Sequence, residues 1–207
     1  MIKYPIIVVD DFFEDPDAIH DLGMSVDYPI DLPSWPGKRS ESLEVIDKRL
    51  FDYFISKVFS AFGLKPNACY LTAGFQKILP YSPNKWNPRN RGWIHRDAGN
   101  VIFGGIVYLT KNADKDTGTS IYKPKKGYAI TLDEDNSMKE SLYKEEDIDD
   151  EKYNKAYNEH TNQFEETIKV DNIYNRFFSF PNTTWHGVRT CGTEERLTIP
   201  FFCHKVD

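Results

Sequence analysis

The sequence predicts a mainly β protein, a β-sandwich or jelly roll that is supported by helices near its N-terminus. An amphipathic helical pattern lies in the first third of the chain, and short runs of β-branched and aromatic residues follow from residue 70 onward. Aromatic residues are plentiful, with 14 Phe, 12 Tyr and 4 Trp, which is typical of a folded chain that contains strands. Helices that precede many short strands favour two packed sheets with the helices beside them.

The first forty residues predict a strand, a helix start and a loop. The apolar run at residues 6–9 predicts a short strand. Asp15 and Pro16 then indicate a helix start, because Asp caps a first turn well and Pro suits the first helical position. Residues 28–42 contain three Pro and one Gly, so we expect a loop there.

Residues 46–62 predict the clearest helix of the chain. Gly63 follows as a natural C-terminal stop. An apolar stripe on such a helix packs in the core, so we do not interpret it as a binding face. The apolar residues that recur at helical spacing are Ile46, Leu50, Phe54, Val58 and Phe62.

The rest of the chain predicts strands, apart from one acidic stretch. Strands are expected at residues 70–79, 101–110, 119–122, 128–132, 176–180 and 196–203, with a Pro/Asn-rich loop at 80–92. Residues 133–169 form a polar, acidic insertion, which we interpret as a solvated helix or surface loop. A lid is the alternative, because the insertion lies between the candidate metal ligands described below. No repeat or linker divides the chain, so residues 1–207 are expected to form a single domain.

Composition argues against several classes of protein. The net charge of −6 disfavours a nucleic-acid binder, which needs a basic face to neutralise phosphates. The apolar run at residues 6–9 is far too short for a signal-peptide core or a membrane span, so we expect no membrane partner. The three cysteines form no C-x-x-C pair and are interpreted as reduced thiols. A cytoplasmic location is the expectation.

His95 and Asp97 are the first candidate metal ligands. Residues at i and i+2 of an extended segment point to the same side, so an imidazole and a carboxylate can converge on one ion. With 5 His and 32 Asp plus Glu in 207 residues, such a triplet is expected about once by chance. The triplet also occurs in the protein-kinase catalytic loop, but that loop needs an Asn where Ile102 stands here.

His186 is the third candidate ligand, and it lies between two strand-like runs. Two His and one carboxylate on one face of an octahedral ion leave three positions open. This set suits Fe(II) enzymes that bind a co-substrate and O₂ together, although it does not exclude zinc.

Arg196 and Thr198 add a candidate carboxylate site. Arg196 lies ten residues beyond His186 and begins an apolar strand. Its guanidinium can hold a carboxylate through two parallel hydrogen bonds, and the Thr198 hydroxyl, on the same side of the strand, can add a third.

The order His-x-Asp, distal His and Arg resembles the Fe(II)/2-oxoglutarate oxygenase superfamily, and most closely its prolyl-hydroxylase-like branch. The strand Ile106-Val107-Tyr108-Leu109-Thr110 is similar to the family's I-Y-Y-L-N strand. The segment that begins Thr117-Gly118 is similar to its G-G-x-x-x-F turn, with Thr in place of the first Gly. The spacing from Asp97 to His186 is longer than is usual in the family.

This resemblance implies a double-stranded β-helix core, with Fe(2+) held by His95, Asp97 and His186. Arg196 would bind the distal carboxylate of 2-oxoglutarate, helped by Tyr108 and Thr198. The implied activity is a dioxygenase that consumes O₂ and 2-oxoglutarate, releases succinate and CO₂, and hydroxylates a C–H bond. The prolyl-hydroxylase likeness favours a peptidyl substrate, and a small molecule is the alternative.

Several residues have competing interpretations. Arg189 is a rival to Arg196 but lies only three residues from His186. The remaining histidines, His20, His160 and His204, are interpreted as surface or structural residues. Residues that would line the mouth of a pocket, or pack in the core, are Trp35, Arg39, Trp86 and Trp93.

Two other functions stay open at this point. One is a cupin-like metal enzyme that uses the same three ligands without 2-oxoglutarate. The other is a non-catalytic β-sandwich module, in which the two histidines would contribute only to stability.

Overall fold

The structure is a computed structural model that describes residues 4–31, 35–97, 99–128, 137, 139–140 and 150–207. None of the described helices is long and apolar enough to cross a membrane. The described helices and strands, in chain order, are β1 (Ile7–Val9), α1 (Pro16–Ser25), β2 (Lys38–Ser42), α2 (Leu43–Ile46), α3 (Lys48–Ala61), β3 (Cys69–Ile78), β4 (Phe103–Tyr108), β5 (Thr119–Pro124), α5 (Asp150–Thr161), β6 (Phe164–Val170), β7 (Phe177–Pro181), β8 (Trp185–Val188) and β9 (Arg196–Val206).

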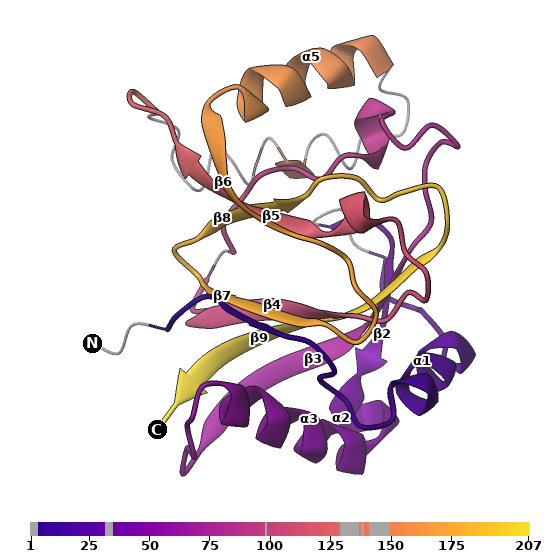
Figure 1. Ribbon diagram of the computed structural model, residues 1–207, viewed down its shortest axis with the longest axis vertical. Coiled ribbons are helices and arrows are strands. Elements are labelled where there is room, and N and C mark those ends of the chain that lie inside the picture. The colour runs from indigo at the N-terminus through magenta and orange to yellow at the C-terminus, as the bar shows by residue number, and fades with distance from the viewer. Residues whose placement is uncertain (1–3, 32–34, 98, 129–136, 138, 141–149) are drawn as a thin grey trace.

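Two antiparallel sheets lie face to face (Figure 1). The larger sheet has six described strands in the order β1-β7-β4-β9-β3-β2, and the smaller has three in the order β6-β5-β8. Helices α1, α2 and α3 lie on the far side of the larger sheet, and α5 lies beyond the smaller one (Figure 1). The predicted mainly β class with supporting N-terminal helices is therefore confirmed.

The outer face of the larger sheet forms the main hydrophobic core. Along β9, Leu197, Ile199 and Phe201 point to this face and are buried with Phe54 and Val58 of α3. Side chains alternate between the two faces of a strand, so Arg196 and Thr198 point instead to the space between the sheets.

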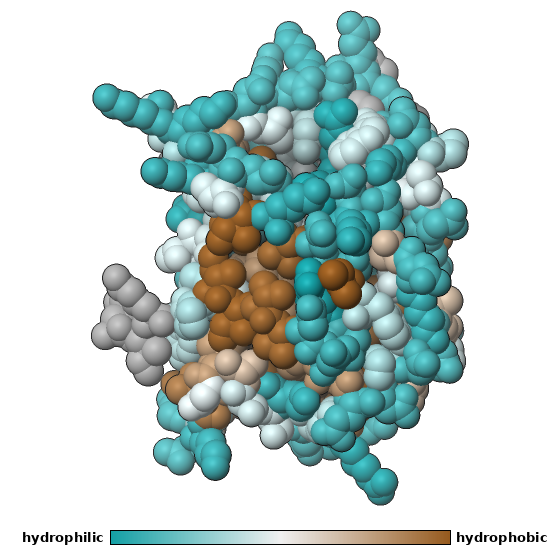
Figure 2. All heavy atoms as spheres, in the orientation of Figure 1, coloured by the Kyte–Doolittle hydropathy of each residue, from teal (hydrophilic) through white to brown (hydrophobic). Residues whose placement is uncertain are grey.

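A second cluster of buried apolar residues fills much of the space between the sheets. Its members are Tyr108, Ile121, Val170, Phe178 and Phe180. Hydrophobic residues gather in Figure 2 in the region that separates the two sheets in Figure 1. The sheets are thus packed through apolar contacts, and the cavity described below lies beside this cluster.

The N-terminal helices follow the predicted signals, with one correction. The Asp15 carboxylate accepts a hydrogen bond from the Ala18 backbone N at 3.0 Å, as a cap of α1 should. The single helix predicted at 46–62 is wrong at its start, because Asp47 has an extended backbone (φ −153°, ψ 103°) that separates α2 from α3. The Asp47 side chain then caps α3 by accepting from Arg49 N and Leu50 N.

The loop predicted at 28–42 is wrong in its last five residues, which form the edge strand β2. The three prolines of that segment all precede Gly37, whose φ of 72° makes the turn that leads into the strand. Arg39 then pairs with Gln76 of β3. A polar edge strand lacks apolar alternation, so only its long-range partner reveals it.

The acidic insertion at 133–169 contains more regular structure than a solvated loop. Its described part includes all of α5 and most of β6, which pairs with β5 in the smaller sheet. Only Phe164 and Val170, at the two ends of β6, are buried, so the strand has no apolar alternation to indicate it. The strand predicted at 128–132 does not include Tyr128, and its other residues lie outside the described part.

Candidate functional site

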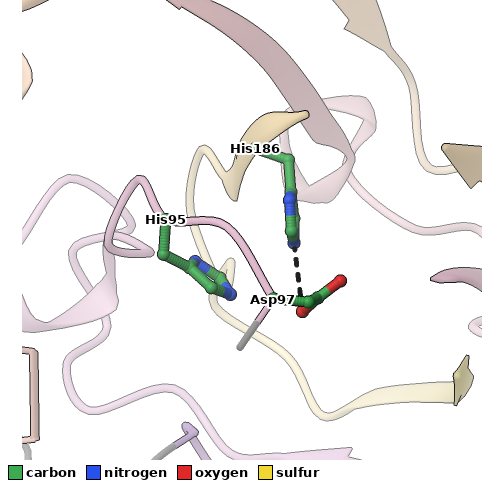
Figure 3. A group of neighbouring side chains, drawn as sticks. All are labelled: His95, Asp97 and His186. Carbon is green, nitrogen blue, oxygen red and sulfur yellow. Dashed lines mark ion pairs between the residues drawn. The ribbon is translucent and has the colours of Figure 1, made fainter. Parts of the chain in front are cut away.

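His95, Asp97 and His186 come together at the edge of the smaller sheet (Figure 3). One ligand atom from each lies within 4.8 Å of the other two. His186 belongs to β8, and the segment that carries His95 pairs with it through two backbone hydrogen bonds of 2.9 Å. Asp97 follows two residues later, and its Oδ1 lies 3.8 Å from His186 Nε2. A strand pairing therefore positions all three side chains.

Both imidazoles present the same nitrogen to the centre of this group. The Nδ1 of His95 donates to the Trp93 carbonyl at 2.9 Å, and the Nδ1 of His186 donates to the Thr184 carbonyl at 3.1 Å. A carbonyl only accepts hydrogen bonds, so each Nδ1 carries the proton and each Nε2 keeps its lone pair. Such a backbone contact is the usual way to orient a metal-binding imidazole.

Burial keeps both imidazoles neutral at neutral pH. It lowers the pKa of His95 well below its usual value, and the nearby positive charge of Lys139 lowers it further. Burial also lowers the pKa of His186, although the Asp97 carboxylate opposes this shift. Neutral imidazoles are the form that binds a cation.

Gly104 of β4 makes room for the Asp97 carboxylate. A Cβ at position 104 would lie 3.2 Å from Asp97 Oδ2 and 3.2 Å from the Phe201 carbonyl oxygen. These are tight contacts, so a side chain here would press on the carboxylate. The glycine therefore leaves room for the Asp97 carboxylate beside β4.

The other histidines have structural or surface positions, as predicted. His160 of α5 is buried, stacks on Trp93 at 4.0 Å between ring centroids, and donates from Nε2 to the Ile94 carbonyl at 2.7 Å. It thereby supports the segment that carries His95. His20 bonds to Asp21 at the surface, and His204 lies against Tyr70 near the C-terminus.

The three candidate metal ligands line a cavity of about 430 Å³, and Arg196 lines it too. Arg196 is buried, and its Nε donates to the Thr117 carbonyl at 3.2 Å, whereas its Nη2 has no hydrogen-bond partner. The rival Arg189 forms ion pairs with Asp116 at 3.1 Å and Asp171 at 3.7 Å and does not line the cavity. The structure therefore favours Arg196 as the residue that faces a ligand.

Thr198 and Tyr108 lie beside Arg196 on the inner face of the larger sheet. The Thr198 hydroxyl is fully buried without a hydrogen-bond partner. The Tyr108 ring lies 5.6 Å from the Arg196 guanidinium carbon, and its hydroxyl donates to Thr119 Oγ1 at 2.8 Å. Neither Tyr108 nor Thr198 lines the cavity itself, and Thr119 does.

Sequence reasoning missed other residues that line the cavity, namely Gln76, Thr119 and Phe180. Phe180 packs on the His186 ring with centroids 4.2 Å apart. The sequence signal that could have indicated Thr119 is its place at the start of the strand predicted at 119–122, two residues after Thr117. Of the aromatic residues proposed for the mouth, Trp35 and Trp93 line the cavity, as Arg39 does, but Trp86 does not and is 46% exposed.

The donor set fits a divalent metal ion and a dicarboxylate. Two neutral imidazoles and one carboxylate are typical ligands of Fe(II) in enzymes that leave positions open for a co-substrate. The Arg196 Nη2 and the Thr198 hydroxyl, both on β9 of the larger sheet, are buried donors that have no hydrogen-bond acceptor. A carboxylate would satisfy both.

A family model described as "Family of unknown function (DUF6445)" matches residues 2–194. The chain belongs to this family. No curated protein matches it.

Solved structures match this DUF6445 chain over nearly its whole length. A prolyl hydroxylase from Trichoplax adhaerens, in complex with a hypoxia inducible factor peptide fragment, has a TM-score of 0.56 at 12% identity, over 96% of this chain and 83% of that one. HygX from Streptomyces hygroscopicus, with nickel and 2-oxoglutarate bound, has a TM-score of 0.60 at 12% identity, over 96% and 82%. A 2OG-Fe(II) oxygenase family oxidoreductase from Burkholderia pseudomallei has a TM-score of 0.54 at 13% identity, over 96% and 84%.

These likenesses establish the fold. The chain has the fold of the Fe(II)/2-oxoglutarate oxygenases, including their prolyl-hydroxylase-like branch, as the sequence resemblance indicated.

Proposed function

We propose that this protein is an Fe(II)- and 2-oxoglutarate-dependent dioxygenase that hydroxylates a C–H bond of its substrate. One observation carries the proposal. Ligand atoms of His95, Asp97 and His186 lie within 4.8 Å of one another, in the cavity that also contains the buried Arg196. A metal site with an adjoining carboxylate site is what such a reaction needs.

His95, Asp97 and His186 would hold the iron on one face. Their Nε2 atoms and the carboxylate converge, while the Nδ1 protons are occupied by backbone carbonyls. Iron bound there with 2-oxoglutarate supplies the oxidative chemistry, in which the co-substrate is converted to succinate and CO₂. Phe180 packs against His186 and helps to keep water away from that side of the cavity.

Arg196 would orient the co-substrate. Its Nε is fixed by the Thr117 carbonyl, so the guanidinium cannot rotate freely, and Nη2 is available for the distal carboxylate. The Thr198 hydroxyl would donate a further hydrogen bond. Tyr108 would act by holding Thr119 and by contacting the guanidinium with its ring face.

The substrate is proposed to be a peptidyl or small-molecule compound. A structurally similar prolyl hydroxylase is seen with a peptide fragment, and HygX is seen with hygromycin B. A cavity of about 430 Å³ can accept either kind of ligand, in whole or in part.

An anaerobic titration of the metal-free protein with Fe(II) and then 2-oxoglutarate tests the proposal. We expect a weak visible charge-transfer band that requires both additions. The His186→Ala variant should lose iron binding. The Arg196→Ala variant should bind iron normally but 2-oxoglutarate at least tenfold more weakly, because it loses charge-assisted hydrogen bonds. The matched controls are His204→Ala and Arg189→Ala, which alter residues outside the cavity.

The other outcomes identify the alternatives. Iron binding without any response to 2-oxoglutarate would favour a cupin-like enzyme. The absence of iron binding would contradict an enzymatic role of this site. Equal loss of iron and 2-oxoglutarate binding in Arg196→Ala would contradict the role given to that residue.

A further inference from the structure

A second group of unpartnered donors lies in the same cavity, away from Arg196. It consists of Trp35, which precedes β2, and Arg39 of β2 itself, and both side chains line the cavity. The Arg39 guanidinium carbon lies 3.8 Å from the centroid of the Trp35 ring. The loop between them is held by Gln76, whose Nε2 donates to the Pro36 carbonyl at 2.7 Å.

Both residues have a buried N–H group without an acceptor. Neither Trp35 Nε1 nor Arg39 Nε has a hydrogen-bond partner. The Arg39 guanidinium also forms no ion pair with any residue that the structure describes. Buried donors are nearly always paired in native proteins, so two adjacent orphaned donors indicate a ligand that accepts hydrogen bonds.

The charge of Arg39 also lacks a counterion of its own. Burial lowers the pKa of Arg39 to about 10, and attraction to Asp97 opposes that shift. The guanidinium therefore remains charged at neutral pH. In the proposed function the Asp97 carboxylate binds the metal, so its negative charge is shared with a divalent ion. The partly buried Arg39 cation would then be stabilised by a second anion.

The distal carboxylate of 2-oxoglutarate is not that anion. Arg39 pairs across the sheet with Gln76 of β3, and Gln76 pairs with Thr198 of β9. Strands are spaced by about 4.8 Å, so β2 and β9 lie about 10 Å apart. The Arg39 guanidinium carbon lies 5.6 Å from the ring of Phe202, which is four residues, or about 13 Å, beyond Thr198 along β9, so this guanidinium points away from Arg196. The two donor groups form separate sites on one sheet face.

We propose that Trp35 and Arg39 form an anion subsite that binds a carboxylate of the substrate. The proposal rests on the oxygenase function proposed above and specifies its substrate class. The guanidinium donates to the carboxylate oxygens, the indole N–H adds a further hydrogen bond, and the Trp35 ring holds the guanidinium plane. The Phe202 ring, 5.6 Å from the guanidinium carbon, offers an apolar wall for the rest of the molecule.

Calorimetric titration of the full chain, loaded with Mn(II) and 2-oxoglutarate, tests the subsite. The probes are N-acetyl-L-amino acids and the matching N-acetyl-L-amino acid amides, which differ only in the terminal carboxylate. N-acetyl-aspartate amide and N-acetyl-glutamate amide carry a side-chain carboxylate instead. We expect members of the acid series to bind at least tenfold more tightly than their amides. Binding of the two acidic amides would identify an acidic peptide side chain, rather than a terminal carboxylate, as the group recognised.

Three variants locate the effect. Arg39→Gln should weaken acid binding at least tenfold and leave binding of amides and of 2-oxoglutarate within about twofold. Arg39→Lys keeps the charge without the planar fork and should lose less. Trp35→Phe keeps a ring without the N–H and should weaken acid binding about threefold. Arg91→Gln is the control, because Arg91 bonds to the Trp86 carbonyl outside the cavity.

Four results would overturn the proposal. They are equal binding of the acids and their uncharged amides, no binding of any probe that carries a carboxylate, unchanged acid binding in Arg39→Gln at normal thermal stability, and an equal loss of 2-oxoglutarate binding in that variant. The last result would instead make Arg39 a contact of the co-substrate. Failure of the wild type to load Mn(II) and 2-oxoglutarate, which is measured first, would contradict both proposals together.

Discussion

At the scale of single residues, the candidate co-substrate site contains polar atoms that the folded chain leaves unsatisfied. The Arg196 Nη2 and the Thr198 hydroxyl are buried without partners, in a protein whose other buried side chains include many that are paired, such as Asn90 and Asn175. A buried unpaired donor costs about 1–3 kcal/mol of stability. These residues therefore destabilise the ligand-free protein, and a carboxylate would offset that cost.

Thr198→Val tests this balance of stability against binding. Valine has the same shape without the hydroxyl, so we expect the free energy of unfolding of the ligand-free protein to stay the same or rise by about 1 kcal/mol. The affinity for 2-oxoglutarate should fall about threefold to tenfold. Chemical denaturation and the anaerobic titration measure the two quantities.

The matched control is Thr110→Val. Thr110 Oγ1 accepts from Leu197 N at 2.9 Å, so its removal should cost about 1 kcal/mol of stability and leave the affinity for 2-oxoglutarate unchanged. An unchanged 2-oxoglutarate affinity in Thr198→Val would exclude the hydroxyl from the co-substrate site.

At the scale of elements, the site depends on a segment that is not a regular strand. His95 is held on one side by its backbone pairing with His186 of β8. On the other side, α5 supplies His160, which stacks on Trp93 and bonds to the Ile94 carbonyl. The helix of the acidic insertion thus supports the candidate metal site from outside the cavity.

His160→Ala tests the role of α5. The variant leaves the Ile94 carbonyl without its donor and removes the ring stack, so we expect a loss of about 2–3 kcal/mol in the free energy of unfolding. Iron affinity should fall about tenfold, because His95 is less well oriented. Denaturation and Fe(II) titration measure these changes, and His204→Ala should change stability by no more than about 0.5 kcal/mol. Full iron affinity in a destabilised His160→Ala protein would show that α5 stabilises the fold without orienting His95.

At the scale of the whole molecule, the proposed ligands join the two sheets. His186 belongs to the smaller sheet, whereas Arg196 and Thr198 belong to the larger one. A metal ion and 2-oxoglutarate bound between them would therefore connect two layers that otherwise meet through apolar contacts. Binding of both should be visible as added thermal stability.

Metal and co-substrate are thus expected to raise the melting temperature together. With each ligand at 100 times its Kd, one binding event adds about 2.7 kcal/mol. For a chain of this size that corresponds to about 5–10 °C. Thermal denaturation with Mn(II), with Mn(II) plus 2-oxoglutarate, and after addition of a chelator measures the effect. The chelator should reverse it, and His95→Gln should abolish it; an equal shift in that variant would place the ion elsewhere.

The sequence by itself determined the fold class, the helix that contains Phe54 and Val58, and the candidate residues His95, Asp97, His186 and Arg196. These features are encoded locally: helical and strand periodicity, a capping residue, and side chains two positions apart on an extended segment that share one face. The resemblance to oxygenases depended on the order of those same few residues. The single-domain organisation and the metal ligation stay predictions.

The tertiary structure alone decided which residues share the cavity. Strands β2 and β6 have no apolar alternation, so only their pairing with β3 and β5 reveals them. Arg196 was separated from Arg189 by burial and by ion pairs that no spacing rule contains. The same is true of Arg39 and Trp35, which reach the site because β2 pairs at the sheet edge. Long-range pairing and burial depend on the whole chain, and local sequence patterns do not specify them.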